Sequence, residues 1–227
     1  MGRVGRTLGT GLLAAGLFAA AWTVTVWVWQ DPFTAIYTGY EQHELAHSLD
    51  HQIAQFKVVH RRSELTLLRE QNLVASEART EQRQAKVGQA IGRIIVPRMG
   101  LNMVVVNGTD ESSLQKGPGR YLGSTMPGEG QLVYIAGHRT TYLAPFSKID
   151  LLHKGDRITI EMPYATFIYR VSGYRIVPAS DLKVLRSPGH ELLELQACHP
   201  RFSASHRFIA YALPVKVIPR GGHPYSL

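Results

Sequence analysis

The chain has 227 residues and a formal net charge of +8, a length that suits one medium-sized domain with extensions. Residues 87–227 carry 16 basic and 9 acidic side chains, so the positive charge belongs to the C-terminal part, where it favours nucleic acid or an anionic membrane or cell wall as partner. The single cysteine excludes an internal disulfide.

Residues 1–30 are predicted to form a short cytoplasmic tail and a transmembrane anchor. No charged residue lies between Thr7 and Trp29, and about 23 helical residues span the hydrocarbon core of a bilayer. Arg3 and Arg6 precede this stretch, which predicts a cytoplasmic N-terminus and places the rest of the chain outside the cell. A cleaved signal peptide is the alternative. An exported chain is not expected to bind nucleic acid.

Residues 31–90 are predicted to form a helical stalk or linker. Charges of both signs alternate there, and Leu45, Leu49, Ile53 and Phe56 recur at helical spacing. One helix of about 50 residues would extend roughly 75 Å and hold the following domain away from the membrane. A partly ordered polar tether is the alternative, since the apolar stripe breaks near residues 60–63. Three histidines spaced four apart either bind a metal or, as we favour, form a solvated helix face: His43, His47 and His51.

Residues 91–218 have the pattern of an all-β domain, followed by a short tail at 219–227. Short apolar runs bounded by Gly, Pro and Asn predict seven or eight strands, and hence a barrel or sandwich. Residues 157–162 and 167–177 are predicted to form a hairpin. Short helical turns are expected at 111–115 and 144–152.

Three chemically active side chains are predicted to lie where a strand meets a loop, the position at which a rigid scaffold presents catalytic groups. Cys198 ends the run 191–197 and is followed by a proline, His138 follows the strand 132–136 after one glycine, and Arg207 opens the run 208–213. A thiolate is a strong nucleophile, an imidazole transfers protons, and a guanidinium stabilises an oxyanion. A buried structural role for Cys198 and a surface ion pair for Arg207 are the alternatives.

Four segments in this order resemble the sortases, and among them the class E type of high-GC Gram-positive bacteria. The resemblance covers about residues 91–218, and the segments that carry it are Gly117–Tyr121, Ala136–Tyr142, Ala197–Pro200 and Ser203–Arg207. It implies a mainly β fold, an eight-stranded sortase-type barrel with short helices, preceded by the anchor and the stalk. It also implies a catalytic set of His138, Cys198 and Arg207, with substrate contacts at Tyr121, Thr140 and Ala197. For Tyr121, a purely structural role is an equally weighted alternative.

The function that this resemblance implies is a membrane-anchored cysteine transpeptidase. Such an enzyme cleaves secreted proteins at a C-terminal LPxTG- or LAxTG-like sorting signal, between Thr and Gly, through a Cys thioester. It then transfers the protein to a peptidoglycan precursor amine of the lipid II kind. The catalytic domain is expected to be extracellular on a single-pass anchor, and no cofactor or metal is expected.

The sequence departs from the family before the cysteine, because Glu194 and Ala197 stand where sortases usually carry threonines. This departure keeps open a sortase-shaped binding module without turnover. A cysteine peptidase acting on the cell wall is a second alternative, although such hydrolases usually place Cys before His in the chain. A structural metal site at Cys198, His199 and His206 is the third, and it lacks a fourth ligand.

Overall fold

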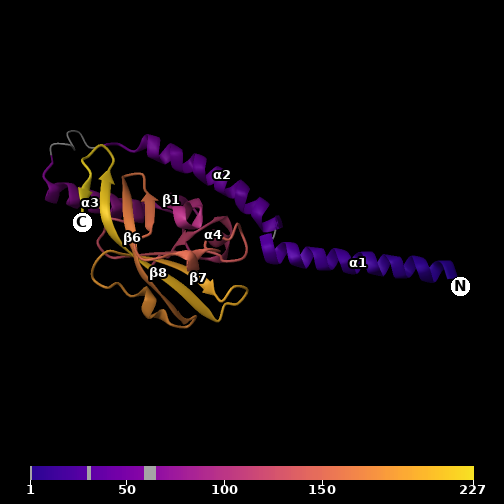
Figure 1. Cartoon of the computed structure of the whole chain (residues 1–227). Coiled ribbons are helices and arrows are strands. Elements are labelled where there is room, and N and C mark those ends of the chain that lie inside the picture. Colours follow the sequence, from indigo (N-terminus) through magenta and orange to yellow (C-terminus); the bar gives the residue numbers. More distant parts are fainter. Residues whose placement is uncertain (1, 30–31, 59–64) are drawn as a thin grey trace.

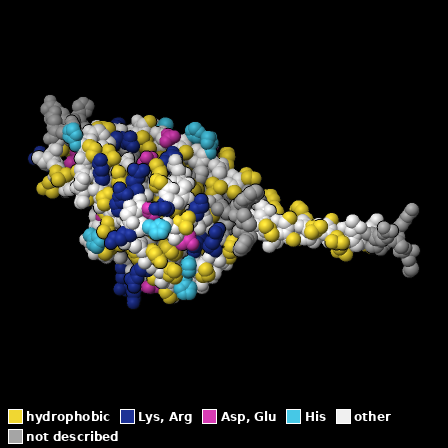
Figure 2. Space-filling model, in the orientation of Figure 1, with side chains coloured by type: hydrophobic (Ala, Val, Ile, Leu, Met, Phe, Trp, Pro, Cys, Tyr) yellow, Lys and Arg dark blue, Asp and Glu magenta, His cyan; other side chains and the backbone are white. Residues whose placement is uncertain are grey.

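The computed structural model describes residues 2–29, 32–58 and 65–227. Figure 1 shows a long helix, α1 (Gly2–Trp29), extending away from a β-domain on which further helices lie. Within α1 the stretch Thr7–Thr25 is long and apolar enough to cross a membrane, which makes it a candidate span. Hydrophobic side chains are spread along the described part of this helix (Figure 2). The predicted boundary at 30–31 and the predicted break at 60–63 lie outside the described residues.

The domain is a closed β-barrel. Within the described residues, the sheet order is β6-β5-β1-β2-β3-β4-β7-β8-β9, and the additional pairing of β6 with β8 closes eight strands into a barrel, with β9 added to the edge of β8. The strands are β1 (Ala90–Val96), β2 (Leu101–Asn107), β3 (Gly119–Arg120), β4 (Leu132–Ala136), β5 (Arg157–Glu161), β6 (Ala165–Pro178), β7 (Leu192–His199), β8 (His206–Pro219) and β9 (Tyr225–Ser226). Closure leaves the barrel strands without a free edge. The predicted eight-stranded barrel is confirmed.

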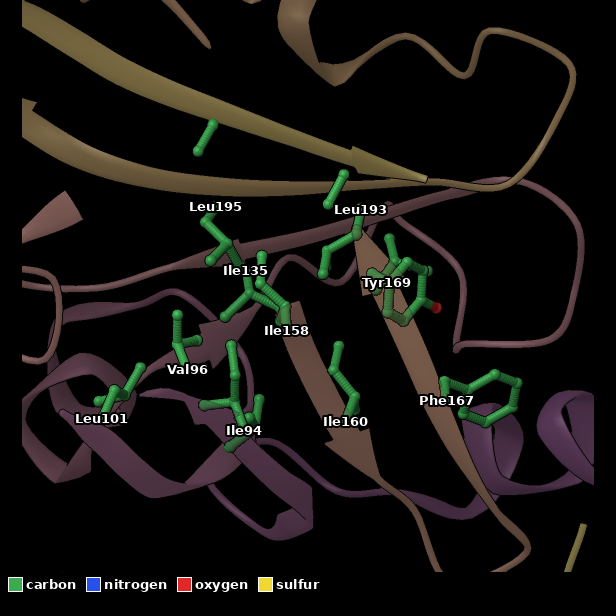
Figure 3. Packing of buried hydrophobic residues seen from close by; sticks show 14 of the residues in the cluster. Ile94, Val96, Leu101, Ile135, Ile158, Ile160, Phe167, Tyr169, Leu193 and Leu195 are labelled. Carbon is green, nitrogen blue, oxygen red and sulfur yellow. The ribbon is translucent and has the colours of Figure 1, made fainter. Parts of the chain in front are cut away.

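The core of the barrel follows from the alternation of apolar and polar residues along its strands. In β5, Ile158 and Ile160 are buried while their polar neighbours are not, because successive side chains point to opposite faces. Figure 3 shows these two isoleucines packed with Ile94 of β1 and Ile135 of β4. The predicted hairpin is the antiparallel pair β5–β6, in which Ile160 lies opposite Phe167.

Short helices occur in the connections. In the described part of the chain they include α4 (Glu111–Lys116) and the 3-10 turns η2 (Pro97–Met99), η3 (Ile149–Leu151) and η4 (Leu182–Leu185). Helix α4 begins at Asp110, whose side chain accepts a hydrogen bond of 3.1 Å from the backbone N–H of Ser113. The helical turns predicted at 111–115 and 144–152 therefore correspond to α4 and η3.

The predicted stalk is helical, but it is not a free-standing rod. Helix α2 (Pro32–Gln55) lies against the barrel, where Leu45 and Leu49 are buried with Val104 and Val106 of β2. The Gln42 side chain accepts a hydrogen bond from the backbone N–H of Val104 at 2.7 Å and donates to its carbonyl at 3.0 Å. The narrow apolar stripe of this segment therefore faces the barrel rather than a second helix.

Helix α3 (Leu67–Gln84) also packs on the barrel. Val74 and Ala78 are buried in the main core, and the side chain of Gln82 accepts a hydrogen bond of 3.2 Å from the backbone N–H of Met126. Figure 1 shows α2 and α3 running along the β-domain. The two helices together enlarge the barrel domain beyond residues 91–218, and they correct the expectation of a spacer that separates it from the membrane.

Replacing Leu49 with Ala tests this packing. Leu49 is fully buried, so Leu49→Ala removes apolar contacts and leaves a cavity, which should lower the free energy of unfolding by about 2–4 kcal/mol. The measurement is chemical denaturation of the full chain in detergent. Glu44→Ala, an exposed change on the same helix, should stay within about 0.5 kcal/mol of the wild type. Equal stabilities of the two variants would show that α2 does not pack on the barrel.

Candidate active site

The barrel closure brings Cys198 and Arg207 together. Cys198 is the next-to-last residue of β7, and it pairs directly with Arg207 at the start of the antiparallel strand β8. Directly opposite residues project from the same face of a sheet with Cβ atoms about 5 Å apart. Cys198 is a free, half-buried cysteine. The thiol and the guanidinium are therefore neighbours because of the strand register.

His138 reaches the same end of the barrel from β4. The parallel pairing of β4 with β7 aligns Ala136 with Gln196, and the backbone N–H of Gly137 donates to the carbonyl of Gln196 at 3.0 Å. His138 and Cys198 each lie two residues beyond that aligned pair. A Cβ atom on Gly137 would lie 2.8 Å from the ring of Phe146, so glycine permits the close approach at this point.

The three side chains line one open cavity of about 360 Å³. Its floor is formed by the outward-facing residues of β4 and β7, Tyr134, Ala136 and Gln196. One wall consists of residues from 179–185, which include the turn η4, and Leu114 and Tyr121 contribute to the other. The cavity is a groove lined largely by apolar side chains. His138, Cys198 and Arg207 form part of this lining.

Arg139 holds the histidine loop against the cysteine strand. Its side chain is buried, and its Nη1 donates to the carbonyl of Cys198 at 3.3 Å and contacts His199 Nδ1 at 2.9 Å. Its Nη2 forms an ion pair of 2.8 Å with Asp150 of η3. Arg139 was not among the residues predicted from the sequence, although its position next to the proposed acid/base His138 is a signal that could have found it.

Burial governs the protonation of His138. The pKa of the imidazole is lowered by burial and raised slightly by the distant charge of Glu111. Its Nε2 is buried without a hydrogen-bond partner among the described residues. Burial therefore favours the neutral form of the ring.

Arg207 is held at the mouth of the cavity by its own loop. Its Nη1 donates to the carbonyl of Ala204 at 2.8 Å and to the carbonyl of His206 at 3.0 Å. Its Nε and Nη2 make no hydrogen bond to any residue that the structure describes. These groups remain available to an anionic partner in the cavity.

The predicted substrate contacts are not all brought together. Tyr121 is half-buried and lines the cavity, with its ring edge-on to Tyr134 at 6.1 Å between centroids. Thr140 lies in the loop after His138 and does not line the cavity. Ala197 is fully buried in the barrel core, because alternate residues of β7 point inward. The structure therefore corrects the prediction that the side chain of Ala197 contacts the substrate.

The other histidines that the structure describes do not line the cavity with Cys198. His199 faces Arg139 on the opposite side of β7, and His206 is exposed and bonded to Ser205. In the described ranges no group of three or more His, Cys, Asp or Glu side chains is arranged to hold a metal. On α2, the Nε2 atoms of the exposed His43 and His47 lie 3.2 Å apart.

Glu194 is a buried carboxyl beneath the same face of β7. It stands between Tyr134 of β4 and Tyr211 of β8 in the strand register, and its Oε2 has no hydrogen-bond partner within the described part of the chain. Burial raises its pKa to about 7. The pKa of Tyr134 is raised by burial and by Glu194, and it is lowered by Arg207. A carboxyl therefore stands where sortases usually carry a threonine, and its Oε2 is buried without a hydrogen-bond partner among the described residues.

Comparison with known proteins agrees with the barrel fold. The family model described as the sortase domain matches residues 94–215, more than half of the chain. The chain therefore belongs to the sortase family.

Two curated relatives show the range of this likeness. The chain is 33% identical to sortase D of Bacillus subtilis over 132 residues, which is 56% of this chain and 64% of the relative. It is 28% identical to sortase SrtE1 of Streptomyces coelicolor over 158 residues, 62% of this chain and 45% of the relative. The chain thus spans less than two thirds of either protein, and D-type as well as E-type enzymes are among its relatives.

Solved structures share the fold. A sortase D5 transpeptidase of Clostridium perfringens aligns with a TM-score of 0.63 at 21% identity, covering 78% of this chain and 99% of that one. Sortase E1 of S. coelicolor, solved with a tripeptide in its active site, aligns with a TM-score of 0.56 at 24% identity, covering 60% of this chain and 95% of that one.

Glu194 should make stability fall as the pH rises. Its pKa is raised from an ordinary value of about 4.5 to about 7, so the carboxyl is protonated in the fold where it would be ionised in the unfolded chain. The stabilisation is complete below about pH 4.5 and is lost as the pH rises through 7, on the order of 1–3 kcal/mol. Glu194→Gln should remove this dependence and be the more stable protein at pH 8, as measured by denaturation at several pH values. Parallel pH profiles of the two proteins would contradict the assignment.

Proposed function

We propose that the chain is a membrane-anchored cysteine transpeptidase that cleaves a C-terminal LPxTG- or LAxTG-like sorting signal between Thr and Gly. It would transfer the cleaved protein to an amine of a peptidoglycan precursor. The observation that carries the proposal is that Cys198, His138 and Arg207 line one open cavity in a chain of the sortase family.

The first step is acylation of the cysteine. The Sγ of Cys198 attacks the carbonyl carbon of the signal's threonine, and its proton passes to the neutral imidazole of His138. Arg207 stabilises the oxyanion of the tetrahedral intermediate through the donors that its loop leaves free. The intermediate collapses to a thioester as the C–N bond breaks, and His138 protonates the departing glycine amine.

The second step returns the enzyme to its starting state. The acceptor amine attacks the thioester carbonyl, and His138 takes the proton that the amine loses. The C–S bond breaks, the new amide forms, and the thiolate of Cys198 recovers its proton from His138. The lowered pKa of His138 suits this role, because the neutral base is present at the start of each half-reaction.

Arg139 is a positioning residue in this scheme. It does not line the cavity, but its guanidinium joins the backbone carbonyl of Cys198 to the loop that begins at His138. A buried, charge-assisted hydrogen bond of this kind limits the separation of the two segments. The distance between His138 and Cys198 is thereby restricted before substrate binds.

The groove also supports a peptide substrate. Its walls include Leu182, Val184 and Leu185, an apolar surface for the Leu-Ala or Leu-Pro part of a signal. Tyr121 offers a hydroxyl on the other side, where it would read the second position of the signal. The S. coelicolor sortase E1 structure, which shares the fold, holds a tripeptide in its active site, and this supports a peptide as the substrate here.

The membrane location rests on α1. Arg3 and Arg6 precede the candidate span Thr7–Thr25, and this order supports an orientation with the barrel on the outer side of the membrane. The basic barrel, seen as many Lys and Arg side chains in Figure 2, is suited to an anionic wall or membrane surface. Both features support a groove that meets exported proteins and a lipid II-like acceptor.

Mass spectrometry of the acyl-enzyme tests the proposal. The full chain in detergent, mixed with a Leu-Ala-x-Thr-Gly peptide and no amine, should carry a thioester adduct that ends at the threonine. Cys198→Ala should carry none, and Arg207→Lys should form the adduct about 100-fold more slowly, because it loses the oxyanion fork. An adduct on another residue, or a wild type that alkylates at Cys198 yet never acylates, would overturn the proposal in favour of a binding module.

A further inference from the structure

The first two turns of α2 carry an exposed stripe of large apolar and aromatic side chains. Its members recur at the i, i+3, i+4, i+7 spacing of one helix face, and 42–74% of each side chain is exposed: Phe33, Ile36, Tyr37 and Tyr40, here called the aromatic stripe. The barrel is held by other residues of α2, since Thr38 donates to the carbonyl of Gln115 at 2.7 Å. Most of the surface of Phe33, Ile36 and Tyr40 is exposed, and an exposed apolar patch of this kind marks an interaction surface.

The stripe is continuous with the candidate membrane span. The ring of Phe33 lies 5.6 Å from the ring of Trp22, and Trp22 belongs to the apolar stretch Thr7–Thr25 of α1. The first residue of the stripe is thus beside the span, not beyond its end. Whatever environment surrounds the C-terminal part of the span must reach the start of α2.

We propose that the aromatic stripe inserts into the interface between headgroups and acyl chains on the outer side of the membrane. The proposal rests on the membrane anchoring put forward above. Tyrosine and phenylalanine suit this zone because their rings are apolar and the tyrosine hydroxyl still reaches water or headgroups. A helix that is polar or barrel-bound on one side and apolar on the other lies in the plane of such an interface.

Insertion of the stripe would hold the active site at the membrane surface. The hydroxyl of Thr34, on the same first turn of α2, accepts a hydrogen bond of 3.1 Å from the backbone N–H of Tyr142. The ring of Tyr142 lies 5.0 Å from the ring of His138. The loop that carries His138 is therefore tied to the inserted turn, and a membrane-tethered amine would reach the thioester without leaving the bilayer.

Depth-dependent fluorescence quenching tests the location of the stripe. The full chain with Cys198→Ala is reconstituted in lipid nanodiscs, and single cysteines at Tyr37→Cys or Tyr40→Cys carry an NBD probe. Lipids with a doxyl quencher near the headgroup should quench both probes at least about threefold more than a probe at His51→Cys, an exposed position farther along α2. A probe at Leu17→Cys, at the middle of the candidate span, reports insertion of the span itself when the doxyl group is carried deep in the acyl chain.

Each pattern of quenching decides the matter. Quenching at 17 with 37 and 40 no better quenched than 51 overturns the stripe and leaves the anchor. No quenching at 17 overturns both. Cross-linking between copies through 37 or 40, without quenching, would assign the stripe to a second copy of the chain and contradict the proposal. The assay involves no turnover, so it is independent of the acyl-enzyme measurement.

A transfer assay tests the consequence for catalysis. The double variant Ile36→Ser, Tyr40→Ser should lower transfer of a Leu-Ala-x-Thr-Gly peptide to an aminated lipid in vesicles about fivefold or more. Transfer to a soluble amine should stay at the wild-type rate, because neither residue lines the cavity. Equal losses with both amines, or no loss with either, would contradict a role in presenting the membrane-bound acceptor.

Discussion

The buried guanidinium of Arg139 is the interaction on which the site depends. One side chain contacts the carbonyl of Cys198, the ring of His199 and the carboxylate of Asp150. These partners belong to the end of β7 and to η3, while Arg139 itself follows His138. The loop between β4 and η3 is long and its backbone has positive φ angles at Tyr142, Leu143 and Ala144, so strand pairing alone does not fix it. The arginine supplies the missing constraint.

The contacts of Arg139 with Cys198, His199 and Asp150 are here called the Arg139 clamp. The strand register of the barrel positions the catalytic side chains around it. Cys198 and Arg207 are direct partners across β7 and β8, and the parallel β4–β7 pairing brings His138 alongside. A shift of one residue in either pairing would turn Cys198 toward the core, where Ala197 now lies. The nucleophile, the base and the cation thus converge because the barrel closes in one register.

Much of this was predictable from the sequence, for physical reasons. The apolar runs at 157–162 and 167–177 predicted the hairpin, and proline and glycine marked the strand ends that present Cys198 and His138. The packing of α2 was not predicted, because Leu45 and Leu49 have the same helical spacing whether the helix packs on another helix or on a barrel. Arg139 was missed because its partner Asp150 is far from Cys198 in the chain, and only the folded loop joins them. Ala197 was chosen from the family motif, and its burial follows from strand alternation that the motif does not express.

We infer that Arg139 fixes His138 opposite Cys198, and a double-mutant cycle of thiol reactivity tests this inference. The alkylation rate of Cys198 by iodoacetamide is measured from about pH 5 to 9 in the wild type, Arg139→Gln, Asp150→Asn and the double variant, with circular dichroism confirming that each is folded. The account predicts that Arg139→Gln reacts about tenfold more slowly and loses the limb of the pH profile that reports His138. Asp150→Asn should have a smaller effect, and the double variant should be no slower than Arg139→Gln. A folded Arg139→Gln protein with the wild-type rate and pH profile would contradict the claim.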